Sequence, residues 1–369
     1  MTPIRLGMVG GGQGAFIGGV HRIAARMDGM FTLVAGALSS DPERARASAE
    51  DLGLAPERTY MTWDGMARAE ATRPDGIEAV AIVTPNHLHA GPAVAFLERG
   101  IHVICDKPLA ATAEQAAAIA AAARASGAMF FLTHNYPGTP MVREARAMVA
   151  AGALGALRLV EVEYVQDWLA RPVSNKQADW RTDPAQSGAG ALGDIGTHAW
   201  NLARFVSGLR PEALAAEVST LVPGRRVDDN VSAHLRFAGG ARGRLWASQV
   251  AVGHENGLRL RLAGSDGGLD WSQEDPNRLW FTPIGEPRRL LTRGGAGTGP
   301  AAQGRVPAGH PEGYLEAFAT LYADIARAIR TGDRAACPVA GIEDGLEGMR
   351  FIAACLASSA AGGAWVPMH

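Results

Sequence analysis

The sequence predicts an N-terminal α/β domain with a doubly wound parallel sheet, followed by an α+β domain built on a large, mostly antiparallel open sheet. Three observations carry this prediction. An apolar run at residues 4–9 enters a glycine-rich turn. Short apolar runs then alternate with amphipathic segments up to residue 133, as expected for strands and helices around a parallel sheet. Beyond residue 134, strand-like runs follow one another with few helices between them.

The predicted elements divide the chain into residues 1–133 and 134–369. We expect the C-terminal helix to pack back on the first domain, and residues 293–304, rich in Gly and Ala, to form a mobile loop. In the first domain we expect strands at 4–9, 31–38, 79–83, 101–105 and 129–133, and helices at 16–27, 42–52, 89–99 and 113–126. In the second we expect strands at 156–165, 213–221, 230–237, 243–250 and 258–262, and helices at 141–150, 198–206, 314–330 and 342–360.

Composition excludes several classes of function. The 369 residues carry a formal net charge of −2, so no global field attracts nucleic acid or an anionic membrane. No stretch is long and apolar enough to span a bilayer, and the first residues have no secretion-signal pattern. The three cysteines are scattered and show no metal-ligand spacing. We therefore expect a cytoplasmic protein with reduced thiols and no bound metal.

The first candidate site is the glycine-rich turn. Gly10, Gly12 and Ala15 fit the G-x-G-x-x-G/A pattern of dinucleotide-binding turns. Glycine permits the tight turn and a close backbone approach to a pyrophosphate, and the start of the following helix favours an anion. The alternative is a tight strand-to-helix turn without a ligand. The candidate cofactor-binding residues here are Gly10, Gly12, Gln13, Gly14, Ala15 and Phe16.

Two further segments follow the carboxyl ends of predicted parallel strands, where ligands of such sheets bind. The first runs from Thr84 and Pro85 through Asn86 and His87 to His89. Its Asn and His side chains suit a ribose or nicotinamide, but they could equally be local helix caps. The second is Asp106-Lys107-Pro108. Pro108 stiffens the backbone at Lys107, and a cis bond before it would point that lysine in a fixed direction. The alternative for Lys107 is an ordinary solvated surface lysine.

The third segment is glycine-rich and contains Asp194 and His198. The two stand four residues apart, so they can share one face of a helix. A carboxylate one turn from a histidine can orient the ring and raise its basicity, which suits a general base. The alternative is an Asp194 helix cap and a histidine in the core.

These three segments, in this order, resemble the Gfo/Idh/MocA oxidoreductase family over essentially the whole chain. The family's usual Glu-Lys-Pro motif corresponds to Asp106-Lys107-Pro108, which keeps the charge and shortens the acid. The resemblance implies a Rossmann domain joined to an α+β domain, and a catalytic set of Lys107, Asp194 and His198. It also implies hydride transfer between a nicotinamide cofactor and a secondary alcohol of a sugar, inositol or related polyol. His198 would take the hydroxyl proton, Lys107 would stabilise the alkoxide, and Asp194 would orient His198.

Cofactor choice and substrate contacts follow from single residues. Ser39, Ser40 and Arg44 stand where an acid would indicate NAD, and a Ser followed five residues later by a basic residue resembles the family's NADP users. The sequence thus favours NADP, with NAD left open, and Asp41 is expected to cap the helix at 42–52.

Tyr136, Trp180 and Arg181 are candidate substrate ligands, because aromatic rings stack on sugars and Arg donates to hydroxyls. Weaker candidates are Asp167, Asn201 and His310, whereas Trp168 and Trp200 are expected in the core.

Two other functions stay open for this sequence. A sensor of the same fold would bind the dinucleotide without turnover, but it would need no Lys107, Asp194 and His198 set. An NAD-dependent glycosidase would hydrolyse its substrate without net formation of reduced cofactor. In each case we expect a homo-oligomer, a dimer or a tetramer, formed through the sheet of the second domain.

Overall fold

The chain folds into two compact units, and the computed structural model describes residues 2–368. The first unit extends to Asn135 and also contains Phe318–Leu346. The second contains Tyr136–Ala317 and the residues from Glu347 on. The expected boundary at residues 133 and 134 lies two residues before the end of the first segment. The expected second domain is interrupted, because residues 318–346 belong to the first unit.

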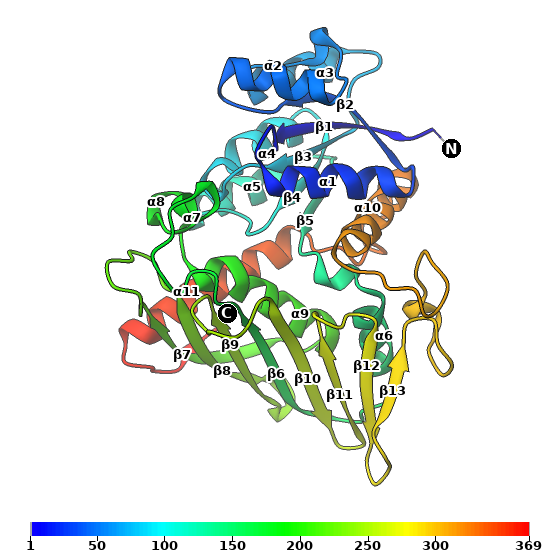
Figure 1. Cartoon of the computed structure of the whole chain (residues 1–369), viewed down its shortest axis with the longest axis vertical. Helices are drawn as coiled ribbons and strands as arrows, with labels where there is room; N and C mark the ends of the chain where they lie inside the picture. The colour runs from blue at the N-terminus through cyan, green and yellow to red at the C-terminus, as the bar shows by residue number, and fades with distance from the viewer. Residues whose placement is uncertain (1, 369) are drawn as a thin grey trace. The chain divides into compact units, whose positions relative to one another are not determined.

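The first unit is built on a parallel sheet of five strands in the order β2-β1-β3-β4-β5 (Figure 1). Every residue of β3 is buried, as its continuous apolar sequence predicts for a strand covered on both faces. The elements are β1 (Ile4–Gly10), α1 (Phe16–Met27), β2 (Phe31–Ala37), α2 (Pro42–Asp51), α3 (Trp63–Thr72), β3 (Ala79–Val83), α4 (Ala90–Leu97), β4 (His102–Asp106), α5 (Ala113–Ala125), β5 (Phe130–Thr133) and, from Phe318 on, α10 (Tyr314–Thr331).

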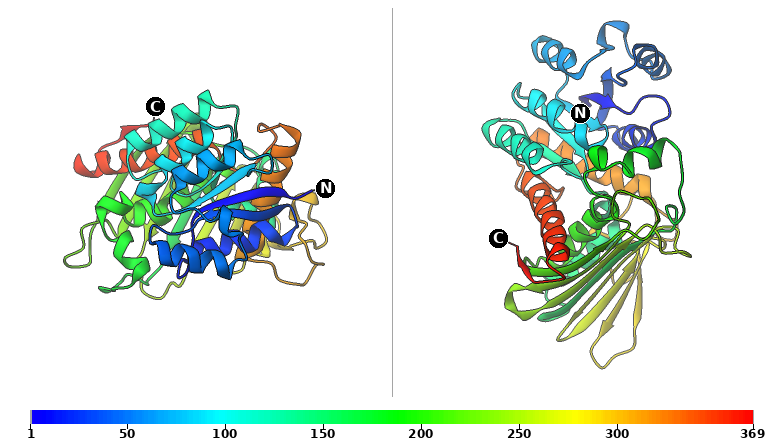
Figure 2. Two further views of the ribbon diagram at one scale, coloured as in Figure 1. Left: turned by 90° about the horizontal axis from the view of Figure 1, so that it is seen from above. Right: turned by 90° about the vertical axis from the view of Figure 1, so that its left-hand side faces the viewer.

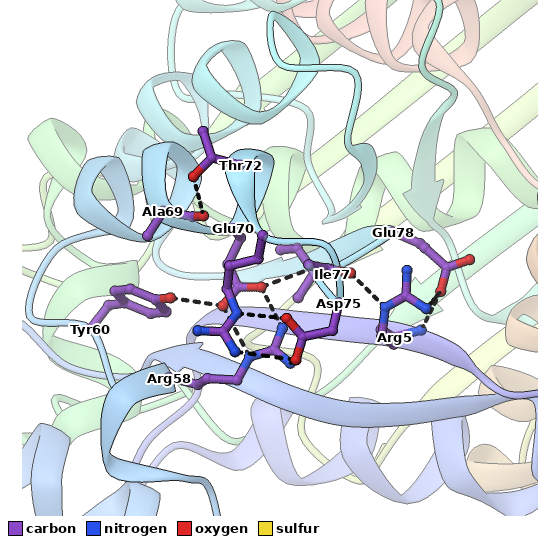
Figure 3. A network of polar contacts seen from close by, with 11 residues as sticks. Arg5, Arg58, Tyr60, Ala69, Glu70, Thr72, Asp75, Ile77 and Glu78 are labelled. Carbon is purple, nitrogen blue, oxygen red and sulfur yellow. Dashed lines mark hydrogen bonds and ion pairs between the residues drawn. The ribbon is translucent and has the colours of Figure 1, made fainter.

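A buried ion pair connects α3 to the chain segment that precedes it (Figure 3). Glu70 of α3 is fully buried and accepts hydrogen bonds from both Nε and Nη2 of Arg58. It also accepts from the hydroxyl of Tyr60 at 2.8 Å and from the amide of Ile77, just before β3, at 3.0 Å. The carboxylate therefore has partners on both oxygens, as a buried charge requires.

The second unit contains a nine-stranded, mostly antiparallel sheet in the order β13-β12-β11-β10-β6-β9-β8-β7-β14, in which β6 and β9 pair in parallel. The sequence did not lead us to expect the strands beyond β10. The strands are β6 (Leu157–Val165), β7 (Pro211–Ser219), β8 (Asn230–Phe237), β9 (Arg242–Ser248), β10 (Gly257–Gly264), β11 (Gly267–Ser272), β12 (Arg278–Pro283), β13 (Arg289–Thr292) and β14 (Val366–Pro367).

Helices of this unit cover one face of the nine-stranded sheet (Figure 2). Val160 and Val162 of β6 point into the core on this side, whereas Glu161 and Glu163 alternate with them on the other face. This period of two is the signature of a half-covered sheet. The helices that cover the sheet are α6 (Pro140–Ala150), α9 (Thr197–Ser207) and α11 (Ile342–Ala360), the last of which enters this unit at Glu347. The short helices α7 (Lys176–Arg181) and α8 (Pro184–Ser187) contact each other.

Residues 293–304, expected to be a mobile loop, are anchored in the structure. Arg293 is buried, and its guanidinium donates to the carbonyl oxygens of Val306 at 2.8 Å and Pro307 at 2.9 Å. The amide of Gly299 donates to Glu144 Oε1 at 2.8 Å. Glycine content alone did not reveal these long-range anchors.

Candidate active site

The glycine-rich turn has no room for side chains. Gly10 and Gly11 have φ values of +80° and +74°, which L residues with a side chain rarely adopt. A Cβ on Gly12 would lie 2.8 Å from the carbonyl oxygen of Leu38, and a Cβ on Gly18 would lie 2.4 Å from Gly11 Cα. The helix α1 is thus pressed directly against the turn.

This turn fits a nucleotide diphosphate. Helix α1 begins at Ala15 without a side-chain cap, and its first turn contains no acidic residue. Its first amide groups and its dipole therefore favour an anion. Gln13 and Phe16 are exposed beside the turn, with the Gln13 side chain donating to Asp51 Oδ2 at 2.7 Å.

The end of β2 presents serine hydroxyls. Asp41 caps α2, as predicted, with its Oδ1 accepting from the amide of Arg44 at 2.8 Å. Ser39 Oγ accepts from the amide of Asp41 at 3.1 Å, while Ser40 and the Arg44 side chain are exposed. The nearest acid is therefore engaged in capping the helix.

His89 joins the segments that follow β3 and β4. Its ring is fully buried, with Nε2 2.9 Å from the carbonyl oxygen of Thr84 and Nδ1 3.0 Å from that of Pro108. Burial lowers the pKa of His89. The ring therefore connects two loops of the protein, and the expectation that His89 binds the cofactor stays a prediction. Thr84 and Pro85 are half-buried, Asn86 is buried, and the bond between Lys107 and Pro108 is cis.

Lys107 lies between an acid and a histidine of the first unit. Burial by itself would raise the pKa of Asp106, but His21 and Lys107 outweigh it and hold that pKa below its ordinary value. Burial, followed by the positive charge of Lys107, lowers the pKa of His134 to about 3. At neutral pH the lysine is therefore flanked by a carboxylate and a neutral imidazole.

The groups that contact Asp106 could not be predicted from the sequence. Its Oδ1 accepts from Thr133 Oγ1 at 3.0 Å and lies 3.8 Å from His21 Nε2. The opposite ring nitrogen of His21 lies 2.8 Å from the hydroxyl of Tyr322 in α10. A side chain from the distant segment 318–346 thus completes the surroundings of the acid.

In the second unit, Asp194 lies in a π-helical turn, Leu192–Gly196, that leads directly into α9. Such turns are frequent at functional sites. Asp194 Oδ2 accepts from Arg181 Nε at 3.2 Å and from Gln249 Nε2 at 3.0 Å. The Arg181 guanidinium also stacks on the ring of Trp180, with its Cζ 4.3 Å from the ring centroid. Two of the three predicted substrate ligands, Trp180 and Arg181, therefore lie near Asp194, and Gln249 is a partner that the sequence did not reveal.

His198, at the start of α9, packs against two buried tyrosines. Its ring centroid lies 5.1 Å from that of Tyr136 and 6.1 Å from that of Tyr164, both with the rings edge to face. The two hydroxyls are 2.5 Å apart, and Tyr164 donates to Asn256 Oδ1 at 2.8 Å. Tyr136 must then donate to Tyr164, whose only proton is already used. Burial raises the pKa of Tyr136 to about 12 and also raises that of Tyr164.

The remaining candidates have structural partners. Asp167 Oδ2 accepts from the amide of Gly253 at 3.0 Å, and His310 is exposed. Trp200 is buried and stacked on Phe351, as expected for the core, and Asn201 follows it half-buried on α9. Trp168, also expected in the core, is half-buried. Within residues 2–368 no three His, Cys, Asp or Glu side chains gather as metal ligands, and no helix there has the length and apolar character to cross a membrane.

Lys107 belongs to the first unit, and Asp194 and His198 belong to the second. Comparison with known proteins identifies both parts of the chain. Residues 4–134 match a family model described as an oxidoreductase family with an NAD-binding Rossmann fold, and residues 142–270 match the GFO/IDH/MocA C-terminal domain.

Three related proteins span most or all of the chain. A levoglucosan dehydrogenase of Pseudarthrobacter phenanthrenivorans is 33% identical over 76% of each chain. The crystal structure of an oxidoreductase from Sinorhizobium meliloti is 55% identical, with a TM-score of 0.91 over 99% of this chain and all of the other. An inositol dehydrogenase homolog from Azotobacter vinelandii, complexed with NADH and myo-inositol, is 38% identical, with a TM-score of 0.92 over 99% of this chain and 98% of the other. The chain therefore belongs to the Gfo/Idh/MocA family of NAD-binding oxidoreductases.

Proposed function

We propose that this oxidoreductase transfers a hydride between a nicotinamide dinucleotide and a secondary alcohol of a cyclic sugar or polyol. The observation that carries the proposal is the surroundings of Asp194 and His198: a carboxylate fixed by Arg181 and Gln249, one turn before an imidazole packed against two tyrosines. Relatives named for levoglucosan and myo-inositol support a cyclic polyol as the substrate class.

We assign the following roles to the side chains. A bound nicotinamide would supply the hydride acceptor. His198 takes the proton of the substrate hydroxyl, because a neutral imidazole has a ring nitrogen that can accept it. Tyr136 and Tyr164 do not compete for this role, since their raised pKa values keep them protonated. Asp194 orients His198.

Lys107 stabilises the developing alkoxide by its charge. The carboxylate of Asp106 and the neutral ring of His134 leave the lysine as the cationic group of this cluster. From the second unit we propose Trp180 and Arg181 as substrate ligands, because an aromatic face stacks on the C–H groups of a sugar and a guanidinium donates to its hydroxyls. Arg181 has five donors, so its bond to Asp194 leaves others for a hydroxyl.

For the cofactor we propose binding at the glycine-rich turn, with NADP preferred over NAD. Ser39 and Ser40 offer hydroxyls at the end of β2, and Asp41 is engaged as a helix cap. Arg44 is exposed one turn into α2, where it can meet a 2′-phosphate. The Azotobacter structure is a complex with NADH, and titration of this chain with NADH and NADPH tests the preference.

We also propose a cytoplasmic homo-oligomer that uses the uncovered face of the nine-stranded sheet. This face carries charges of both signs, with Arg244 and Arg261 each 3.2 Å from Glu161, and Arg259 paired with Asp270. Such a surface can pair with a second copy of itself. Cys105 and Cys355 are buried free thiols, which suit a reducing compartment.

The test is a screen for formation of reduced nicotinamide across anhydrosugars, aldoses and inositols, with NAD and NADP in parallel. We expect turnover on at least one cyclic polyol. In Lys107→Met, which keeps the aliphatic stem and loses the charge, we expect turnover to fall by about 10²–10⁴-fold. Nucleotide affinity, followed by fluorescence, should change less than threefold. Wild-type turnover in Lys107→Met, or no turnover of any polyol by the wild type, would overturn the proposal.

A further inference from the structure

A single acidic residue holds the start of the segment that carries Asp194 and His198. Asp228 precedes β8, and its Oδ1 and Oδ2 accept from the amides of Gly190 and Leu192, each at 2.7 Å. Its backbone oxygen accepts from the amide of Ala191 at 3.0 Å. Three consecutive amides at the beginning of the π-helical turn thus bind one residue. These are the groups that a helix start leaves without intrahelical partners.

The contact is close enough to fix the position of the segment. A Cβ on Gly190 would lie 1.8 Å from the backbone oxygen of Asp228, so a side chain at Gly190 would force the two backbones apart. Asp194 follows two residues after Leu192, and its own amide donates to the carbonyl oxygen of Gly190 at 2.9 Å. Farther along, Thr197 Oγ1 donates to the carbonyl oxygen of Gly193 at 2.8 Å. A shift at the capped amides therefore moves the turn that carries both functional side chains.

We propose that Asp228 is a positioning residue for the reaction: by binding the amides of residues 190–192 it sets where Asp194 and His198 stand. This inference rests on the proposed roles of those two residues. Asp228 acts through the backbone, since its recorded side-chain hydrogen bonds go to two amides. Its loss should therefore lower turnover more than substrate affinity, because a small misplacement of a base costs much of its rate.

The neighbouring residue provides a matched control. Asp229 is fully buried and its carboxylate also accepts from two backbone amides, those of Leu221 at 2.8 Å and Val222 at 2.9 Å. It has an additional ion pair with Arg225 at 3.3 Å. Its side chain therefore holds the loop before β8 and not the segment 190–192. Replacing either Asp by Asn turns one acceptor into an amino group that faces an N–H. Asp229→Asn also breaks the buried ion pair with Arg225, so the control disturbs its surroundings at least as much as Asp228→Asn does.

The experiment compares Asp228→Asn with Asp229→Asn in the full chain. Hydrogen exchange should rise over residues 190–198 in Asp228→Asn and stay at the wild-type rate there in Asp229→Asn. With the best polyol from the screen, kcat should fall at least tenfold in Asp228→Asn while KM changes less than threefold. In Asp229→Asn kcat should stay within threefold of wild type. If either Asn variant does not fold, as judged by circular dichroism, the Ser pair at the same positions is compared by the same criteria.

Wild-type exchange over residues 190–198 in Asp228→Asn, or an equal loss of kcat in both variants, would overturn the inference. Failure of the proposed function looks different. There the wild type itself turns over no polyol, and the exchange comparison still tests whether Asp228 holds the segment.

Discussion

Replacing Glu70 by Gln tests the buried network of the first unit most directly. The change removes the charge that pairs with Arg58, whose side chain is only 8% exposed. Gln keeps one acceptor oxygen, but its amino group faces donors on Arg58, Tyr60 or Ile77. Removing one partner of a buried ion pair costs about 3–5 kcal/mol, because the remaining charge stays buried without compensation. We expect about 3 kcal/mol, since part of the hydrogen bonding survives.

For a unit of this size, such a loss lowers the unfolding temperature by about 6–12 °C. The assay is urea and thermal unfolding followed by circular dichroism. Asp75→Asn is the control, since Asp75 is 59% exposed although it also pairs with Arg58, and we expect little change. A loss below about 1 kcal/mol in Glu70→Gln would refute the reasoning, because it would mean that Arg58 finds other compensation.

The same variant has a spectroscopic consequence. Burial, and then the hydrogen bond and charge of Glu70, raise the pKa of Tyr60 to about 12. In Glu70→Gln the charge is gone, so the pKa of Tyr60 should fall toward its ordinary value, as measured by ultraviolet titration. An unchanged titration would show that burial alone sets this pKa.

Two further predictions concern the first unit. Gly18→Ala should weaken dinucleotide binding at least tenfold in a fluorescence titration, because its Cβ would lie 2.4 Å from Gly11 Cα. The control Gly19→Ala should bind the dinucleotide like wild type, since a Cβ there meets only Arg22 Nη2 at 3.9 Å. Equal affinities of the two variants would contradict this prediction. The folded-state pKa of His134, about 3, lies below the unfolded value near 6.5, so its stabilising contribution is present above pH 6.5 and is lost as the pH falls toward 3. This contribution to the free energy of unfolding amounts to about 4–5 kcal/mol. Urea unfolding at several pH values should show that His134→Asn loses less of its free energy of unfolding at low pH than the wild type does.

The sequence predicts the elements whose side chains repeat with a clear period. The fully apolar run 79–83 and the alternating run 230–237 match β3 and β8 at both ends. Helix α3 was missed, because its ten residues bury only Met66, Ala67 and Glu70, and the others apart from Trp63 are polar or small. Strands β12 and β13 were missed for a related reason. β13 is the edge strand and is mostly exposed, and β12 beside it has only Leu279 buried, so burial imposes little pattern on either strand.

For the candidate site, the sequence could indicate residues next to a glycine turn or at a strand end, because local rules apply there. It could not indicate Tyr164, Gln249 or Asp228. Each of these reaches its partner across tens of residues of chain, through contacts that form only when sheet and helices pack. Nor could the sequence indicate that the His89 ring contacts the carbonyl oxygens of both Thr84 and Pro108, because Pro108 lies in a separate loop.

The interrupted course of the first unit has a consequence for synthesis. Tyr322 reaches His21 from the far end of the chain, and the carbonyl oxygen of Ala340 accepts from the amide of Leu132 in β5. While the ribosome extends the chain in order, residues up to Asn135 emerge long before these partners exist. The last hydrogen bonds of the nascent N-terminal sheet can therefore form only after most of the polypeptide has been synthesised. A stop codon anywhere before residue 318 would deprive it of them permanently.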